Sequence, residues 1–246
     1  MEPPPAALTM DDPLMVDTGG ARLACRVAGA ETAPPMVLLH ALGEDGSAWA
    51  GPMRHLAASH RVYAPDLRGH GGSDRCAEYS FELMRDDVVG LLDALGLGRV
   101  TVVGHSMGAV VAYLLAGGWP ERVDRLVLEE PPPPVPADPP RTLTDEERAE
   151  PAPFDWDMVA AIRRQRDDPD PAHWDVLAAI TAPALIVSGG AASHLPQEAM
   201  ARMARVIPDC RLVTIEAGHM VHAARPEEFT AHVGAFLAEP PGQSPE

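Results

Sequence analysis

A serine at position 106 has the surroundings of an activated nucleophile. It is the central residue of the segment GHSMG at residues 104–108, between an apolar run at 100–103 and a helical pattern at 107–117. A serine on a sharp strand-to-helix turn is forced outward, and glycines two residues before and after it let the backbones approach closely enough to make that turn. The N–H of Met107, at the start of a helix, would stabilise an oxyanion beside the hydroxyl. The pattern therefore predicts nucleophilic catalysis by Ser106.

A serine hydroxyl is a poor nucleophile near neutral pH until an adjacent imidazole takes its proton. Two histidines near the C-terminus are candidates for this base. His219 directly follows Gly218 after an apolar run at 211–216, so we expect it in a turn above the carboxyl edge of a sheet. His222 stands three residues later, where we expect a helix to begin. This placement favours His219 as the general base.

The sequence shows no spacing typical of a metal site. His, Asp and Glu residues are scattered, and the three cysteines, Cys25, Cys76 and Cys210, form no CxxC motif and cannot all pair. We therefore predict no metal, no cofactor and no disulfide framework. A reducing compartment fits this cysteine content best.

Short strand-like runs alternate with helical patterns along the chain. We expect strands at 14–17, 22–28, 36–40, 61–66, 100–105, 125–130, 184–189 and 211–216. We expect helices at 81–95, 107–117, 197–206 and 226–237, where apolar residues recur every three or four positions. Several of the strand-like runs are apolar at consecutive positions, as strands buried on both faces must be. The alternation predicts an α/β fold with a mainly parallel eight-stranded sheet and helices on both faces.

The alternation is interrupted between residues 131 and 175. This segment begins with a Pro-rich stretch that cannot form a regular core element, and only residues 156–166 look helical. It carries apolar side chains that need a surface to cover, so we interpret it as a short lid; the alternative is a disordered linker. The predicted organisation is one core domain of residues 14–130 and 176–238, a lid at 131–175, and flexible termini at 1–13 and 239–246.

Together these features resemble the α/β-hydrolase fold superfamily from about residue 14 to residue 237. Three further segments carry the resemblance: MVLLHALGEDGSAW at 36–49, YAPDLRGHGGSD at 63–74 and IEAGHMVHAARPEEF at 215–229. The resemblance implies that Ser106 is the nucleophile, that His219 is the general base, and that the backbone N–H groups of Leu42 and Met107 form the oxyanion hole. It also implies that Asp66, Arg68 and Ser73 brace their loop rather than act chemically.

The usual third residue of the family's triad is missing. Most members place an aspartate in the loop that here follows residues 184–188, but Ala192 or Ser193 occupies that slot. Some members, including haloalkane dehalogenases, place the acid after the preceding strand, where this chain has Glu129 and Glu130. Strand alternation sends these two side chains to opposite sides, and the alignment favours Glu130. Glu129, or no functional acid at all, remains open, as does the alternative that both glutamates merely solvate the lid entrance.

Four other side chains are possible pocket residues: His40, His105, Trp156 and His194. For His40 and His105 the alternative is a scaffold role in shaping turns. For His194 the alternatives are a hydrogen bond to the relocated acid and a place on the surface of the loop. We expect Trp49 in the core.

Composition limits the partners. The 246 residues contain 36 acidic and 19 basic side chains, a formal net charge of −17, which disfavours nucleic acid and anionic membranes. No apolar run approaches the roughly 20 residues needed to span a bilayer, and the N-terminus lacks the features of a signal peptide. We expect a cytoplasmic protein with a small-molecule substrate; the oligomeric state stays open.

The sequence thus predicts a serine hydrolase that cleaves an ester, lactone or thioester of a small, largely uncharged organic acid. The HALG stretch at 40–43 is similar to the HSLG loop of enol-lactone hydrolases, which favours a lactone. Serine at the elbow argues against epoxide hydrolases and haloalkane dehalogenases, which resemble this chain but use aspartate there. Two alternatives remain: a non-hydrolytic enzyme with the same pocket, such as a cyclase, acyl transferase, C–C hydrolase or cofactor-free peroxidase, and a ligand-binding or signalling module.

Overall fold

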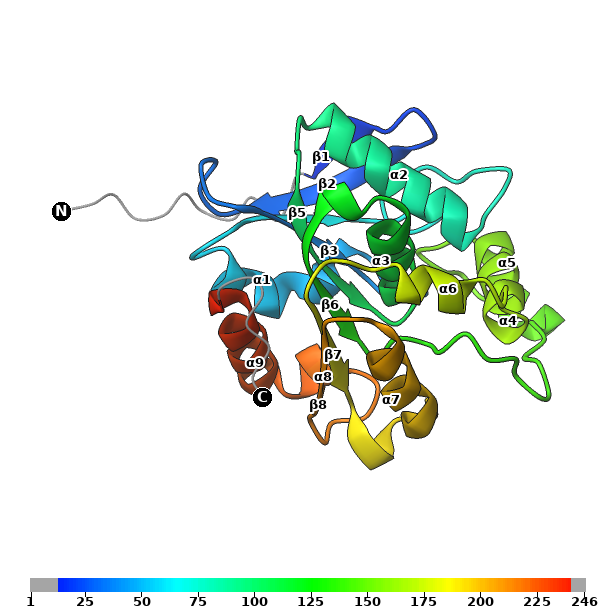
Figure 1. Ribbon diagram of the computed structural model, residues 1–246. Coiled ribbons are helices and arrows are strands. Elements are labelled where there is room, and N and C mark those ends of the chain that lie inside the picture. Colours follow the sequence, from blue (N-terminus) through cyan, green and yellow to red (C-terminus); the bar gives the residue numbers. More distant parts are fainter. Residues whose placement is uncertain (1–12, 240–246) are drawn as a thin grey trace.

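The fold is that of a computed structural model (Figure 1), and the structure describes residues 13–239 of the chain. The predicted flexible termini fall outside the described residues, apart from Pro13 and Glu239. Glu239 is held by an ion pair with Arg211.

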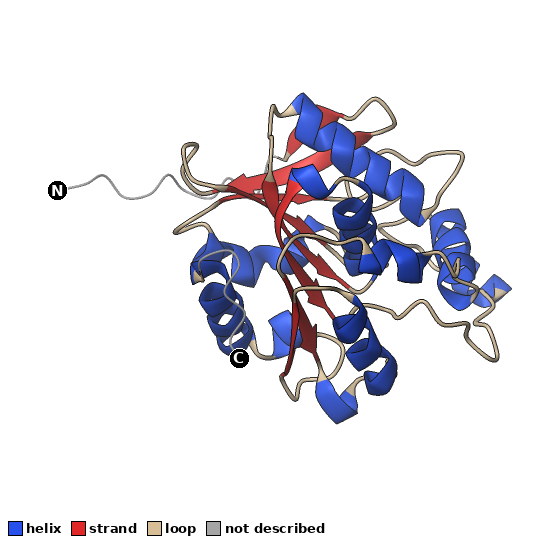
Figure 2. Ribbon diagram, viewed as in Figure 1, coloured by secondary structure: helices blue, strands red, loops and turns tan. Residues whose placement is uncertain are grey.

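An eight-stranded sheet forms the centre of the fold (Figure 2). Its strand order is β1-β2-β4-β3-β5-β6-β7-β8. β2 pairs antiparallel with β1 and β4, and the remaining neighbours are parallel. The predicted fold class is therefore confirmed. The strands are β1 (Leu14–Asp17), β2 (Arg22–Ala28), β3 (Pro35–Leu39), β4 (Arg61–Pro65), β5 (Val100–His105), β6 (Val123–Glu129), β7 (Ala184–Ser188) and β8 (Cys210–Thr214).

Helices cover both faces of the sheet. α2 (Phe81–Ala94), α3 (Met107–Gly118), α6 (His173–Ala178) and α7 (Gln197–Val206) pack on one face. α1 (Ala50–Leu56), α8 (Val221–Ala224) and α9 (Pro226–Ala238) pack on the other (Figure 1). The short 3₁₀ turns are η1 (Gly46–Trp49), η2 (Pro120–Arg122) and η3 (Gly190–Ala192).

Each strand supplies side chains to both faces in alternation. In β6, Leu126 and Leu128 join the core under α2 and α3, whereas Val127 joins the core under α1 and α9. This two-residue period is why the central strands are apolar at consecutive positions. Trp49 is fully buried in the second core, as expected.

The segment after β6 contains more regular structure than the sequence indicated. Besides α5 (Trp156–Asp167) it forms α4 (Asp145–Ala149), and α6 crosses the predicted end of the lid at residue 175. α6 packs on α3, where the Tyr113 hydroxyl lies 3.0 Å from Nδ1 of His173. The N-terminal part of α5 is tied to the core, because the Asp155 N–H donates to the Gly69 carbonyl and the Tyr79 hydroxyl donates to the Asp155 carboxylate.

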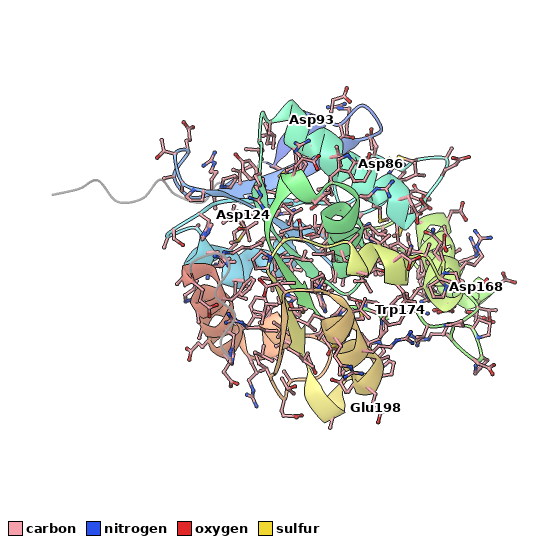
Figure 3. The ribbon with its side chains drawn as sticks, in the orientation of Figure 1. Asp86, Asp93, Asp124, Asp168, Trp174 and Glu198 are labelled. Carbon is pink, nitrogen blue, oxygen red and sulfur yellow. The ribbon has the colours of Figure 1, made fainter. Side chains whose placement is uncertain are left out.

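The acidic charge lies largely on the surface. Asp86 and Asp93 on α2 and Glu198 on α7 are exposed (Figure 3). Among the described helices, none has the length and apolar character required to cross a bilayer.

Candidate active site

Ser106 stands on a strained turn between β5 and α3. Its φ is 50° and its ψ is −112°, in a region that residues other than glycine rarely adopt. Close backbone packing holds the turn. A Cβ on Gly104 would lie 2.4 Å from the Gly108 carbonyl oxygen, and a Cβ on Gly108 would lie 2.2 Å from the Leu39 carbonyl oxygen. Both glycines are therefore required, and Ser106 remains partly exposed at the edge of the sheet.

Glu130 occupies the equivalent position on the neighbouring strand. His105 and Glu129 are register partners in β5 and β6, so Ser106 and Glu130 are the next residues along two adjacent strands. Glu130 also has a positive φ, 47°, and among the described non-glycine residues only it and Ser106 do. Strained backbone of this kind persists where the surrounding structure enforces it and is concentrated at functional sites.

The Glu130 side chain is fully buried and points to His219. Nδ1 of His219 lies 3.1 Å from Oε2 of Glu130. The Gly189 N–H donates to Oε1 at 2.5 Å, and the Ser193 hydroxyl donates to Oε2. Burial alone would raise the pKa of Glu130, but the bonds from His219, Ser193 and Gly189 more than offset it and lower that pKa below its usual value. Glu130 is thus a carboxylate able to orient His219.

The loop after β7, where the acid of most family members would lie, supports Glu130 instead. Ser193 donates to the Glu130 carboxylate and also accepts a bond from the Leu195 N–H at 3.1 Å. The next residue, His194, is exposed, and its ring centroid lies 4.4 Å from that of His219. The sequence had left open whether His194 helps the relocated acid. Ser193 bonds it directly, whereas His194 contacts the histidine.

The two amides predicted to bind an oxyanion are available. The N–H groups of Leu42 and Met107 donate to no acceptor within residues 13–239, and Met107 is the first residue of α3. Ser106 Oγ likewise makes no hydrogen bond within this range.

Neighbouring side chains hold the loop that carries Leu42. The N–H of Ala41 donates to Glu44 at 3.2 Å, and the N–H of Gly43 donates to Nε2 of His70 at 3.2 Å. Burial lowers the pKa of His70 to about 3, so this histidine is neutral and can accept. His40 is fully buried and accepts a bond from the Leu67 N–H at 2.8 Å. His40 is scaffold rather than pocket.

The loop of residues 66–73 has the bracing role that the family resemblance implied. Asp66 accepts bonds from the Gly46 and Gly72 N–H groups and pairs with Arg26. Arg68 pairs with the buried Asp87, and the Ser73 hydroxyl donates to the Asp66 carbonyl at 2.6 Å.

His105 is also fully buried, which again fits the scaffold alternative and not the pocket alternative. Its Nε2 lies 2.8 Å from the His219 carbonyl oxygen, and its Nδ1 lies 3.7 Å from the Glu44 carboxylate, an ion-pair contact longer than a hydrogen bond. Burial lowers the pKa of His105, but Glu129, Glu44 and the His219 carbonyl outweigh burial and raise it. His105, next to Ser106 in the chain, therefore contacts both His219 and the loop that contains Leu42 and Glu44.

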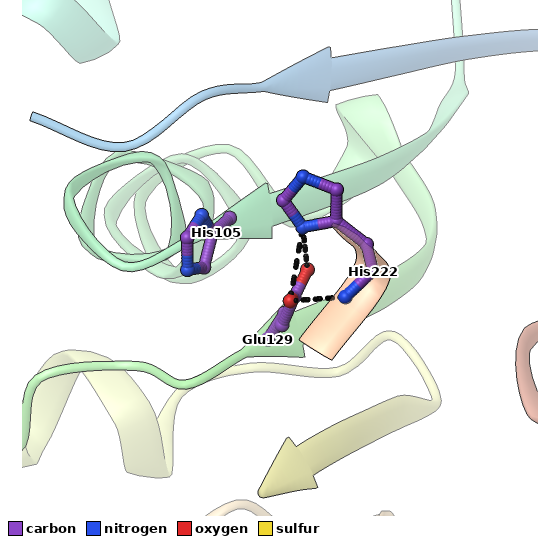
Figure 4. Close-up of side chains that lie close together, drawn as sticks. All are labelled: His105, Glu129 and His222. Carbon is purple, nitrogen blue, oxygen red and sulfur yellow. Dashed lines mark hydrogen bonds and ion pairs between the residues drawn. The ribbon is translucent and has the colours of Figure 1, made fainter. Parts of the chain in front are cut away.

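Glu129, the alternative acid, holds the other histidine. The Glu129 carboxylate is fully buried on the opposite side of the sheet and accepts from the N–H and Nδ1 of His222, at 2.8 Å in each case (Figure 4). His222 stacks on Trp49 with ring centroids 4.3 Å apart. The interpretation that both glutamates solvate the lid entrance is wrong, because neither is exposed.

His105, Glu129 and His222 form a cluster that the sequence spacing did not reveal. Each offers one possible ligand atom, and these atoms lie within 4.8 Å of one another (Figure 4). Imidazole nitrogens and a carboxylate are ligands that suit zinc. Nδ1 of His222, however, is already bonded to the Glu129 carboxylate, and all three side chains are buried. This bonding favours a structural role.

Within residues 13–239, the hydrogen bond and the ring contact of Trp156 involve neither Ser106, His219 nor Glu130. Its indole N–H donates to the Glu150 carbonyl at 2.8 Å, and its ring packs edge-on against Phe154 with centroids 5.0 Å apart. Phe154, an apolar residue of the lid segment that the sequence did not single out, lies beside the loop that carries Leu42: a Cβ on Gly43 would lie 3.3 Å from its ring.

The model of the family described as alpha/beta hydrolase fold matches residues 34–158. The chain belongs to this family. The match includes the oxyanion loop, the Ser106 turn and Glu130 of this α/β hydrolase.

Individual relatives agree with this membership. The chain is 43% identical over 110 residues to an uncharacterised protein of Mycobacterium tuberculosis, a match that spans 44% of this chain and 32% of that protein. It is 26% identical to the enol-lactonase of Burkholderia xenovorans, with a TM-score of 0.75 and coverage of 96% of this chain and 100% of the other. It is 27% identical to a thermophilic esterase of Thermogutta terrifontis, with a TM-score of 0.77 and coverage of 92% and 98%.

Proposed function

We propose that this α/β hydrolase cleaves an ester, lactone or thioester of a small organic molecule through Ser106, His219 and Glu130. The observation that carries the proposal is the buried Glu130 carboxylate, 3.1 Å from Nδ1 of His219. Glu130 directly follows β6, as Ser106 directly follows the neighbouring strand β5. With Nδ1 bonded to Glu130, Nε2 of His219 is left to act on the serine hydroxyl.

The proposed reaction follows from these positions. His219 takes the proton of Ser106 as Oγ attacks the substrate carbonyl, and Glu130 stabilises the imidazolium that forms. The Leu42 and Met107 amides donate to the oxyanion of the tetrahedral intermediate. His219 then protonates the leaving group, and water, activated by the same histidine, releases the acyl group from Ser106. The similarity to an esterase and to an enol-lactonase supports this reaction class.

Labelling with a fluorophosphonate tests the nucleophile. We expect the folded protein and its Ser59→Ala control to be labelled, because Ser59 lies outside the site and bonds the Leu56 carbonyl. We expect no labelling of Ser106→Ala. Turnover of short p-nitrophenyl esters and of a simple aryl lactone should follow the same pattern. Ligand binding without labelling or turnover would instead identify a binding module, and a Ser106-dependent reaction that never releases a hydrolysed product would identify a transferase or cyclase.

A further inference from the structure

Both ring nitrogens of the buried His105 face oxygen acceptors. Nε2 lies 2.8 Å from the His219 carbonyl oxygen, and Nδ1 lies 3.7 Å from Oε2 of Glu44. A carbonyl oxygen accepts hydrogen bonds and cannot donate one, so Nε2 must carry a proton. A neutral imidazole has only one N–H, which leaves Nδ1 without a proton unless the ring is charged.

The state of Nδ1 therefore decides whether His105 carries a charge. This nitrogen is buried and makes no hydrogen bond to any group in residues 13–239. A lone pair on it would face a carboxylate oxygen, and two acceptors turned toward each other in a buried position repel. A proton on Nδ1 makes the same 3.7 Å separation an attractive contact between unlike charges. The contacts of the ring thus favour an imidazolium, which donates at both nitrogens.

The groups around His105 supply the negative charge that this state requires. Glu44 faces the ring from the loop between β3 and η1. Glu129 faces it from the end of β6, where a carboxylate oxygen lies within 4.8 Å of a nitrogen of His105 (Figure 4). Burial lowers the pKa of His105, but Glu129, Glu44 and the His219 carbonyl outweigh burial and raise it, in agreement with the contacts.

Two histidines also face the ring of His105, and neither needs a positive charge for its own bonds. The ring centroids of His219 and His222 lie 4.9 Å and 5.1 Å from that of His105. Each of the two places its Nδ1 against a glutamate carboxylate, to which a neutral ring with its proton on Nδ1 can donate. The positive charge of this group of rings is therefore assigned to His105.

The charged ring contacts two parts of the proposed catalytic site at once. Its Nε2–H donates to the backbone of His219, the proposed base. On its other side it faces the Glu44 oxygen that also accepts the Ala41 N–H at 3.2 Å, one residue before Leu42 and its proposed oxyanion amide. His105 itself directly precedes the proposed nucleophile. One buried charge thus lies between the loops that would carry the base and the oxyanion donor.

We propose that His105 is an imidazolium in the active enzyme and acts as a positioning residue, whose charge holds the loops of His219 and Leu42 in place beside the nucleophile. This inference rests on the proposed function and adds an upper pH limit to it. The charge is present at low pH and is lost as the pH rises through the raised pKa of His105. The lone pair of Nδ1 then meets the Glu44 carboxylate, and the Leu42 loop is no longer held. Turnover should fall while substrate binding changes little, because the Leu42 amide acts on the oxyanion of the transition state.

Nuclear magnetic resonance tests the charge directly. Long-range proton–nitrogen correlation spectra of protein with isotope-labelled histidine distinguish a protonated ring nitrogen from a bare one, and the signals lost in His105→Gln and in His105→Asn assign the ring. We expect both nitrogens of His105 to be protonated at neutral pH, and Nδ1 to lose its proton only in more alkaline solution. A bare Nδ1 at neutral pH would overturn the inference.

Kinetics tests the positioning role. For a p-nitrophenyl ester, kcat of the wild-type protein should fall on the alkaline side with the midpoint at which Nδ1 of His105 loses its proton, while KM stays within about 2-fold. Glu44→Gln keeps an oxygen for the Ala41 N–H but removes the negative charge, so both midpoints should move together to lower pH by about 1 unit or more. Glu31→Gln removes the same charge at an exposed position between β2 and β3 and should leave both midpoints unchanged.

His105→Gln retains a donor for the His219 carbonyl and lacks the charge. We expect it to lower kcat about 10-fold or more and to abolish the alkaline decline. An alkaline decline that stays in place in Glu44→Gln, or whose midpoint differs from that of Nδ1, would overturn the positioning role. Wild-type protein that neither turns over the ester nor is labelled at Ser106 by a fluorophosphonate would be a failure of the proposed function. It would remove the positioning role as well, while the resonance spectra would still show whether His105 is charged.

Discussion

Nδ1 of His219 lies 3.1 Å from the buried carboxylate of Glu130, although the two residues are 89 positions apart in the chain. The neighbouring glutamate, Glu129, makes the same kind of contact with His222 on the other face of the sheet. Two consecutive acids thus hold two histidines that are three residues apart. His219 is partly exposed beside Glu130, whereas His222 is buried against Trp49, which separates a proposed catalytic pair from a structural one.

Glu130→Gln should lower kcat by about 10³- to 10⁴-fold with little change in KM, because the amide cannot stabilise the imidazolium that forms in the transition state. Glu129→Gln should reduce kcat less than about 10-fold, since its partner His222 is buried and stacks on Trp49. Steady-state kinetics of both variants on one p-nitrophenyl ester decide between the two acids. Equal losses in the two variants would mean that Glu130 has no special role.

Ser193→Ala removes one of the donors to Glu130. A hydrogen bond to a charged group contributes about 1.5–3 kcal/mol, so we expect kcat to fall about 10- to 100-fold. The lost donor also raises the pKa of Glu130, whose depressed value depends in part on Ser193. The acidic limb of the kcat/KM profile should therefore move to higher pH, and Ser193→Thr, which keeps the hydroxyl, should restore it. An unshifted acidic limb in Ser193→Ala would show that this bond does not influence Glu130.

Much of the fold could be predicted from the sequence because its elements are long and strongly patterned. The helix expected at 197–206 has those bounds, and the eight predicted strands differ from the observed ones by at most two residues at either end. The lid was described less well. α4 and α6 are short, and α6 is stabilised by packing on α3, a contact between distant parts of the chain that local periodicity cannot show.

The sequence marked Ser106, His219 and Glu130 by a motif or a strand end, and the structure places His219 against Glu130. The supporting contacts of the site had no such mark. The His105 side chain lies 2.8 Å from a carbonyl 114 residues away, and Ser193 donates to an acid 63 residues away. Such pairs depend on the order of the strands in the sheet and on the backbone conformation of single residues, such as the positive φ of Glu130. The spacing of residues along the sequence shows neither of these.

Glu129→Ala should lower the free energy of unfolding by about 3–5 kcal/mol, because it leaves the donors of His222 buried without their acceptor. Urea unfolding measures this loss. Glu121→Ala is the matched control, since Glu121 is exposed on η2, and we expect a change within about 0.5 kcal/mol. A similar, small effect for both variants would contradict the structural role of the Glu129 and His222 pair.

The stabilisation contributed by Glu44 should depend on pH. Burial raises the pKa of Glu44, but its contact with His105 and the Ala41 N–H outweigh burial and lower that pKa from 4.5 to about 2. A depressed pKa means that the contribution is fully present above about 4.5 and is lost as the pH falls through about 2. Glu44→Gln should therefore lower the free energy of unfolding by about 1–3 kcal/mol at pH 6 and much less near pH 2.5. Urea titrations at both pH values, with the exposed Glu146→Gln as control, test this; a loss that does not change with pH would rule out the charge of Glu44 as its cause.

Gly108→Ala should be among the most damaging single substitutions in α3. The added Cβ would lie 2.2 Å from the Leu39 carbonyl oxygen, a backbone atom of the central strand β3 that cannot move aside. We expect a loss of more than about 3 kcal/mol of unfolding free energy, together with loss of fluorophosphonate labelling in the fraction that folds, because the turn that presents Ser106 would open. Gly118→Ala, in the last position of the same helix, is the control: nothing lies within 4 Å of its Cβ, and alanine favours helix by up to about 1 kcal/mol. Thermal unfolding and labelling of the two variants side by side measure the difference, and wild-type behaviour of Gly108→Ala would mean that close approach of α3 to β3 is not what shapes the nucleophile turn.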